Sequence, residues 1–284
     1  MRAPHISREW MHTARDGAQL LVRSSDPPVS PVRCSILLTH GMGEHSGRYE
    51  HVIRRLNDFR FRVIAWDLRG HGRSEGRRGD AADYDMLLDD LQEVWKLAAD
   101  GPGPLFLYGH SLGGQLTLNF AVRYRPQAAG LVITSPWLEL AFNPPRWKLL
   151  LARAASRLWP SFTQDTDVVP ARLSRDLAFL SSLPYPHLVH HRMSARMYAV
   201  LTDGARRARR DATALPYPIL LVHGSQDPVT SVSATRVFFN TLQSADKSLI
   251  VVPEALHETH NDLCRESVLN QITAWLDARV PRDS

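Results

Sequence analysis

The hydrophobic positions of this chain fall into short apolar runs, with longer amphipathic stretches between them. The apolar runs are candidate strands and lie at 35–39, 62–66, 105–108, 130–134, 219–223 and 248–252. The amphipathic stretches carry apolar residues at three-to-four spacing, which predicts helices at 49–59, 84–99, 115–124, 231–242 and 262–278. Strands that alternate with helices in this way predict an α/β fold, in which helices cover both faces of a mostly parallel sheet.

Two segments break this alternation. Residues 12–24 have the pattern of a hairpin that turns at an Asp-Gly pair, as expected for an antiparallel strand at the edge of the sheet. Residues 136–216 separate two candidate strands. A single crossover of about a dozen residues would be enough to connect such strands. We therefore expect one core domain, made of residues 1–135 and 217–284, with a cap inserted at 136–216.

The cap has an amphipathic stretch of its own. Its apolar face is formed by Trp147, Leu150, Leu151, Ala154 and Leu158. Arginines line one flank of that face, at positions 146, 153 and 157. A face of this kind is typical of a lid helix that packs on the core domain. The alternative is an interfacial helix that touches lipid aggregates, which would give the protein peripheral contact with lipid surfaces.

Composition narrows the class of protein. At 284 residues with 44% hydrophobic content, the chain can bury a full core. It has no apolar stretch of about 18 residues, so we expect no transmembrane segment, and its polar first residues lack the apolar centre of a secretory signal. The two cysteines, Cys34 and Cys264, offer neither a disulfide framework nor metal-ligand spacing. These features favour a cytoplasmic protein.

The chain is basic, with a formal net charge of +5, and nearly all of the excess comes from arginine. No helix-turn-helix, zinc-finger or RNA-binding signature accompanies this charge, so we expect no nucleic-acid partner. A basic surface could favour anionic lipid instead. The densest cluster is Arg206, Arg207, Arg209 and Arg210, which is either solvated cap surface or a contact for anionic lipid.

A serine nucleophile is indicated by the pattern G-x-S-x-G, which occurs twice. The copy at 109–113 lies between the apolar run 105–108 and a helical stretch, where small flanking residues let the chain turn sharply and expose the hydroxyl of Ser111. The copy at 72–76 has loop composition on both sides, and a glutamate follows Ser74 directly. That carboxylate would oppose the negative charge that develops when an alkoxide attacks a carbonyl. The context therefore favours Ser111.

A serine nucleophile needs a base, and the base needs a carboxylate to fix its tautomer. His257 follows the last candidate strand after a short loop, which predicts a place at the carboxyl edge of the sheet beside Ser111. His260 is closer to the entry of the final helix, where a helix-entry or supporting role is expected. Asp227 comes directly after another candidate strand and is the predicted acid, with Glu139 as the reserve candidate.

The oxyanion of an acyl-transfer intermediate needs two fixed N–H donors. One is usually the backbone of the residue after the nucleophile, here Leu112, and the other comes from the loop after an early strand. That loop contains the sequence HGMG at 40–43, whose glycines let the backbone approach a ligand closely. We predict that the backbone N–H groups of Met42 and Leu112 are the donors.

Four sequence blocks resemble the monoacylglycerol lipase and lysophospholipase branch of the α/β-hydrolase family, of the serine aminopeptidase S33 type. The blocks are HGMGEHSGRY at 40–49, DLRGHGRSEG at 67–76, GHSLGG at 109–114, and HGSQD with ALHETH around Asp227 and His257. The likeness runs through the predicted core domain. It implies the α/β-hydrolase fold with a helical cap insertion, and it makes the second G-x-S-x-G copy part of a family loop motif.

The resemblance also implies roles for three residues near the oxyanion loop. Glu44, Arg48 and His110 match positions that line or support the alcohol end of the site. The alternative, above all for Glu44 and Arg48, is a salt-bridged and hydrogen-bonded brace of the loop.

Together these residues predict a serine carboxylic ester hydrolase that works through an acyl-enzyme and requires no cofactor or metal. The expected substrate is a monoacylglycerol, a lysophospholipid or a simple medium-chain ester, because the cap supplies apolar and aromatic residues instead of a charge-lined pocket. Peptidase-like, amidase and acyltransferase activities of the same fold are alternatives. A non-catalytic ligand receptor on this scaffold is an alternative of a different class.

Overall fold

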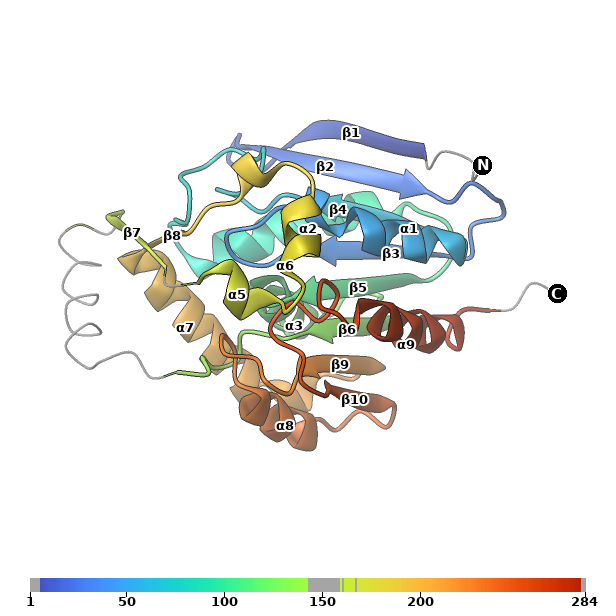
Figure 1. The fold of residues 1–284 in the computed structure, drawn as a ribbon. Coiled ribbons are helices and arrows are strands. Elements are labelled where there is room, and N and C mark those ends of the chain that lie inside the picture. Colours follow the sequence, from blue (N-terminus) through green and yellow to red (C-terminus); the bar gives the residue numbers. More distant parts are fainter. Residues whose placement is uncertain (1–5, 143–158, 160, 167, 282–284) are drawn as a thin grey trace.

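A sheet of eight strands runs through the part of the molecule that the structure describes (Figure 1). This computed structural model describes residues 6–142, 159, 161–166 and 168–281. The strand order is β1-β2-β4-β3-β5-β6-β9-β10. β1 (Ile6–Thr13) and β2 (Gln19–Asp26) form an antiparallel hairpin, β2 also pairs antiparallel with β4, and all other neighbours in this sheet are parallel. The predicted mostly parallel sheet with an antiparallel edge is confirmed.

Six strands of this sheet occupy the six predicted apolar runs, and their ends differ from the predicted ends by one or two residues at most. They are β3 (Cys34–Thr39), β4 (Phe61–Trp66), β5 (Leu105–His110), β6 (Gly130–Thr134), β9 (Ile219–Gly224) and β10 (Lys247–Val252). Every residue of β3, β5, β6 and β9 is buried, as expected for parallel strands covered on both faces. The loops that follow these strands meet at the carboxyl edge of the sheet, where open α/β sheets hold their ligands.

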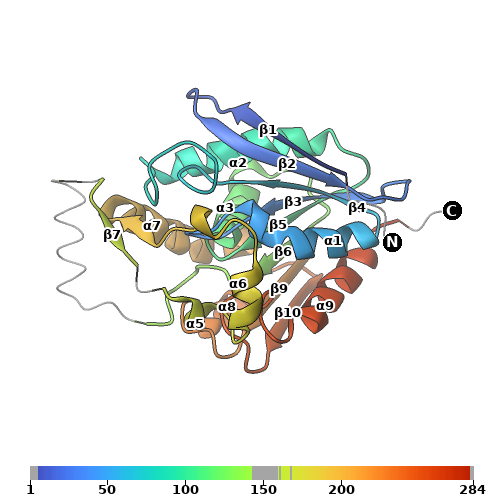
Figure 2. The same ribbon diagram turned by 45° about the horizontal axis from the view of Figure 1, so that its top comes forward.

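Helices cover both faces of this sheet (Figures 1 and 2). α1 (Glu50–Asp58) and α9 (Arg265–Asp277) pack on one face, and α2 (Tyr84–Ala99), α3 (Leu112–Tyr124) and α8 (Val232–Thr241) pack on the other. Each face has its own cluster of buried apolar side chains, drawn from the inward stripe of the helices and from alternate positions of the strands.

Two of these helices begin three residues away from the predicted start. α3 starts at Leu112 instead of at 115, because the chain passes from β5 into the helix at Ser111 without an intervening loop. α9 starts at Arg265 instead of at 262, because the buried carboxylate of Asp262 pairs with Arg175 and holds that part of the chain in a turn.

The segment predicted as a cap contains several short elements that the hydrophobic pattern did not predict. They are β7 (Thr163–Asp165), α5 (Pro170–Leu173), α6 (Leu177–Ser182), β8 (Arg192–Ser194) and α7 (Ala195–Arg210). β7 and β8 pair antiparallel, apart from the main sheet. The apolar stripe of α7 packs on the same face as α2 and α3 and joins the hydrophobic cluster of the core. Short 3-10 turns are present at η1 (Ser46–Tyr49), η2 (Pro186–Leu188) and η3 (Ala212–Ala214).

The amphipathic stretch of the cap lies outside the described residues. This applies to its apolar face at 147, 150, 151, 154 and 158 and to its arginines at 146, 153 and 157. The choice between a lid helix and an interfacial helix therefore stays a prediction. Among the helices that the structure does describe, none is both long and apolar enough to cross a membrane.

Candidate active site

Ser111 lies at the sharp turn between β5 and α3. Its backbone φ of 52° and ψ of −112° fall outside the regions that side-chain-bearing residues usually adopt, which is a strain of the kind found at functional sites. Two glycines make the turn possible. A Cβ at Gly109 would lie 2.5 Å from the carbonyl oxygen of Gly113, and a Cβ at Gly113 would lie 2.2 Å from the carbonyl oxygen of Thr39. Backbone packing therefore requires the two glycines of G-x-S-x-G.

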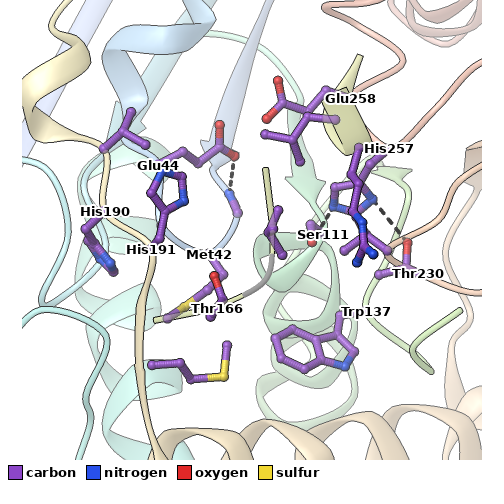
Figure 3. A pocket seen from close by; sticks show the side chains of 18 of the residues that line it. Met42, Glu44, Ser111, Trp137, Thr166, His190, His191, Thr230, His257 and Glu258 are labelled. Carbon is purple, nitrogen blue, oxygen red and sulfur yellow. Dashed lines mark hydrogen bonds between the residues drawn. The ribbon is translucent and has the colours of Figure 1, made fainter. Parts of the chain in front are cut away.

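Two loops at the carboxyl edge of the sheet bring His257 and Asp227 to Ser111. Asp227 follows β9, His257 follows β10, and these strands are neighbours in the sheet. His257 Nε2 lies 3.0 Å from Ser111 Oγ (Figure 3). His257 Nδ1 lies 2.7 Å from Asp227 Oδ2. One continuous chain of hydrogen bonds thus joins three residues that are far apart in the sequence.

The carboxylate of Asp227 is buried and held from several sides. Its Oδ1 accepts the backbone N–H groups of Val229 at 2.8 Å and Thr230 at 2.9 Å, and its Oδ2 accepts the Thr230 hydroxyl at 2.9 Å. His223 Nε2 lies 3.1 Å from Oδ2. Burial alone would raise the pKa of Asp227, but His257 and His223 lower this pKa well below its ordinary value. Asp227 therefore stays ionised and keeps a fixed orientation toward His257.

His257 and the neighbouring His110 have opposite pKa shifts. Burial lowers the pKa of His257, but the carboxylates of Asp227, Glu258 and Glu44 together raise it by more, so the pKa lies above its ordinary value of 6.5. The ring of His110 lies 4.9 Å from that of His257, and His110 Nδ1 is 2.9 Å from the Thr134 hydroxyl. Burial and the rings of His260 and His257 lower the pKa of His110 well below 6.5. His110 is therefore a neutral ring that packs beside His257.

Of the two predicted oxyanion donors, Leu112 follows Ser111 in the chain and Met42 lines the same cavity as Ser111. The loop after β3 approaches Ser111 so closely that a Cβ at Gly41 would lie 3.2 Å from the Ser111 Cβ. Met42 follows Gly41 and lines the cavity above the serine. Leu112 is the first residue of α3, and the N–H groups of a first helical turn have no acceptor within their own helix.

Glu44 and Arg48 form a buried brace of this loop. Glu44 Oε1 accepts the backbone N–H of Gly41 at 2.6 Å and the hydroxyl of Tyr49 at 2.7 Å, and Glu44 Oε2 accepts Arg48 Nε at 3.2 Å. Arg48 also donates to both carboxylate oxygens of Glu258, at 2.9 and 2.7 Å. Burial lowers the pKa of Arg48, but Glu258 and Glu44 raise it by more, so the guanidinium stays charged. Both Glu44 and Arg48 line the cavity as well.

A cavity of about 370 Å³ lies over Ser111, between the core and the predicted cap. Its two ends differ in polarity (Figure 3). Glu44 and Glu258 lie at one end, whereas Met42 and Trp137 lie at the other. Further apolar side chains that line the cavity are Leu140, Phe142, Val168, Leu173, Val189, Met193, Tyr198 and Val229.

Two weaker candidates from the sequence lie elsewhere. The hydroxyl of Ser74 donates to the carbonyl oxygen of Asp67 at 2.5 Å and accepts the N–H of Leu21 at 2.8 Å, so Ser74 braces a loop. Glu139, the reserve acid, is 55% exposed and pairs with Arg209 on α7.

His260 and Glu258 are close to the site, but only His260 was a sequence candidate. The ring of His260 is fully buried, stacks on Tyr49 at 4.9 Å and meets His110 edge-on at 4.8 Å. This packing agrees with the supporting role expected for His260. His260 does not lie at the entry of α9, because that helix begins at Arg265. Glu258 was missed, because no local pattern reveals its pairing with Arg48, which is 210 positions away.

The arginine cluster on α7 is ion-paired. Its partners are Asp203 for Arg206, Asp203 and Asp85 for Arg207, Glu139 for Arg209, and Asp211 for Arg210. A contact of this cluster with anionic lipid stays a prediction. Within the described part of the chain, no group of three or more His, Cys, Asp and Glu side chains is arranged to hold a metal ion.

Comparisons with known proteins match this chain to an established family. The family described as serine aminopeptidase, S33, matches residues 30–264. The chain belongs to this family. Human monoglyceride lipase is 32% identical over 275 residues, which cover 93% of this chain and 89% of that protein. An uncharacterized abhydrolase domain-containing protein of Dictyostelium discoideum is 33% identical over 93% of this chain, which spans 28% of the length of that relative.

Solved structures agree with this assignment. The crystal structure of Paleococcus ferrophilus monoacylglycerol lipase matches with a TM-score of 0.82 and 28% identity, over 97% of this chain and 99% of that one. The resemblance that the four sequence blocks indicate is confirmed, and so is the α/β-hydrolase fold. The chain is a serine hydrolase of the lipase and esterase class.

Proposed function

We propose that this hydrolase forms an acyl-enzyme on Ser111, with His257 as the base and Asp227 as the residue that orients it. The observation that carries the proposal is the continuous contact from the Ser111 hydroxyl through His257 to an ionised Asp227 at the floor of a cavity. A serine hydroxyl is a weak nucleophile on its own. A neutral imidazole in contact with it can take the proton as the new bond forms.

The reaction would proceed in two stages. Ser111 Oγ attacks the ester carbonyl while His257 Nε2 takes the hydroxyl proton, and the backbone N–H groups of Met42 and Leu112 stabilise the resulting oxyanion. His257 then donates the proton to the leaving alcohol, and the acyl group stays on Ser111. In the second stage His257 activates a water molecule, which attacks the acyl group and restores the serine hydroxyl.

We propose monoacylglycerols as the substrate class, and two features of the cavity support this choice. The end with Met42 and Trp137 is apolar and suits an acyl chain, whereas the end with Glu44 and Glu258 suits a small polar alcohol. The relatives described above include a monoglyceride lipase and a monoacylglycerol lipase. Lysophospholipids and simple medium-chain esters share the acyl part and are the other candidates.

We also propose that residues 136–216 act as a cap over the core formed by 1–135 and 217–284, and that this cap touches lipid aggregates. Trp159 and Phe162 are 70% and 44% exposed, and their rings lie 6.1 Å apart. Exposed aromatic pairs are suited to a lipid–water interface. Replacing both by serine should reduce turnover of micellar esters and leave that of monomeric esters unchanged. Equal loss on both would contradict the lipid contact.

A series of p-nitrophenyl esters of rising chain length, with Ser111→Ala as the control, tests the proposed reaction. The wild-type enzyme should hydrolyse these esters with an initial burst of p-nitrophenol, and a fluorophosphonate should label Ser111 covalently. Ser111→Ala should lose both the labelling and, by analogy with other serine triads, about a millionfold in kcat. A folded wild-type protein that cleaves none of the esters, or that is labelled at another residue, would overturn the proposal.

A further inference from the structure

Two buried carboxylates and one guanidinium form the polar end of the cavity. Glu44, Arg48 and Glu258 are only 5%, 8% and 3% exposed. The side-chain oxygens of the two carboxylates accept hydrogen bonds from Arg48 (both), from the Gly41 N–H and the Tyr49 hydroxyl (Glu44), and from the Asn261 amide (Glu258). Both carboxylates therefore act as hydrogen-bond acceptors. The cluster carries one positive and two negative charges, and thus an excess of one negative charge.

The polar cluster lies where the leaving alcohol must sit. That alcohol receives its proton from His257 Nε2, so it has to lie within hydrogen-bond reach of this atom. Glu258 follows His257 directly in the chain, and both line the cavity. The apolar side chains of Met42 and Trp137 lie at the opposite end (Figure 3). The acyl chain and the alcohol are thereby assigned to opposite ends.

Other charges that line the described part of the cavity do little to offset this excess. His110 is neutral, because its pKa lies well below 6.5. Arg172 and Arg192 line the cavity from the cap side, but both are exposed, so water and salt screen their charges. Asp165, which is also exposed, lines the same side and partly balances them.

We propose that Glu258 is a specificity-determining residue that favours esters of neutral or cationic alcohols and disfavours esters whose alcohol carries a phosphate or carboxylate. This inference rests on the proposed function, which assigns the alcohol to the end beside His257. An anionic group there would meet a buried negative charge in surroundings that screen it weakly. Among the candidate substrates, monoacylglycerols are then preferred over lysophospholipids, whose phosphate is attached to the glycerol.

Three esters of one fatty acid test the charge preference in the wild-type enzyme. Dodecanoyl glycerol, dodecanoyl choline and dodecanoyl glycerol 3-phosphate differ in the charge of the alcohol and share the acyl chain. Each is assayed below its critical micelle concentration, so that surface effects do not enter. We expect kcat/KM for the phosphate ester to be at least about tenfold below the values for the neutral and cationic esters.

Glu258→Gln removes the charge and keeps a carbonyl oxygen that can accept from Arg48. The ratio of kcat/KM for the phosphate ester to that for the glycerol ester should rise about tenfold in this variant. The matched control is Glu254→Gln on the same loop. Glu254 is 81% exposed and pairs with Arg175, and it does not line the cavity, so its replacement should leave the ratio unchanged.

Two results would overturn the inference. One is a wild-type enzyme that hydrolyses the phosphate ester as well as the glycerol ester, and the other is a folded Glu258→Gln enzyme with an unchanged ratio. If Glu258→Gln does not fold, the comparison of the three alcohols in the wild-type enzyme decides. A failure of the proposed function would look different, because neither fluorophosphonate labelling of Ser111 nor turnover of any of the three esters would then be seen.

Discussion

Replacing Asp227 by asparagine should stop catalysis almost completely, because the amide would hold His257 in the wrong tautomer. Oδ1 of Asp227 accepts two backbone N–H groups, from Val229 at 2.8 Å and Thr230 at 2.9 Å, so the asparagine oxygen must take this position. The amide nitrogen then takes the position of Oδ2, 2.7 Å from His257 Nδ1. Because an NH₂ group only donates, the ring proton moves to Nε2. A protonated Nε2 cannot accept the proton of Ser111.

The same substitution in a serine protease triad lowers kcat about ten-thousandfold, and the geometry here gives no reason for a smaller loss. That factor corresponds to about 5 kcal/mol of transition-state stabilisation. The assay is kcat for a p-nitrophenyl ester, with circular dichroism and thermal unfolding to show that the variant folds. The control is Asp246→Asn, which makes the same charge change at a half-exposed residue paired with Arg279 and should leave kcat unchanged. A folded Asp227→Asn enzyme that keeps more than a tenth of kcat would refute the tautomer argument.

Three further predictions concern pH, backbone packing and the loop brace. The pKa of His257 is raised, and only the neutral ring can accept the proton of Ser111. We therefore expect kcat/KM to fall as the pH drops through a midpoint above 6.5. A pH profile with its acid midpoint below 6.5 would contradict this. Gly113→Ala places a Cβ 2.2 Å from the Thr39 carbonyl oxygen, which is a backbone atom and cannot move aside as a flexible side chain could. The substitution should lower the free energy of unfolding by about 3 kcal/mol or more. A variant with wild-type stability in urea unfolding would disprove the clash. Tyr49→Phe removes a buried donor to Glu44 and should lower the free energy of unfolding by about 1.5–3 kcal/mol; an unchanged urea midpoint would show that the hydroxyl contributes nothing.

The parallel strands could be predicted because burial on both faces leaves a direct mark on the sequence. Each residue of β3 and β9 is buried, and each strand contains a run of consecutive apolar residues, at 36–38 and at 219–222. β7 and β8 leave no such mark, since each has three residues and a mostly polar composition. Their place depends on distant contacts instead. The N–H of Ser194 donates to the carbonyl oxygen of Gly79, and a Cβ at Gly79 would lie 2.0 Å from the carbonyl oxygen of Arg192.

The convergence of Ser111, Asp227 and His257 could be predicted because each follows a parallel strand, and the carboxyl ends of such strands meet at one edge. The pairing of Arg48 with Glu258 could not. A buried ion pair between two loops produces neither a periodic pattern nor a local motif in the sequence. Its partners meet only when the loop after β3 and the loop after β10 have both folded. The same holds for the polarity of the cavity, which depends on which side chains face inward.

Backbone donors fix the charges of this site before any substrate binds. Glu44 accepts the N–H of Gly41, and Asp227 accepts the N–H of Val229. A buried carboxylate without such partners would cost several kcal/mol of stability and would take up a proton instead. Because these donors belong to turns that follow the strands, they need not move if His257 takes up a proton in the proposed reaction. The turns of the sheet edge would then stabilise that imidazolium together with the side chains, so a substitution that changes only such a turn should lower kcat even when Ser111 is untouched.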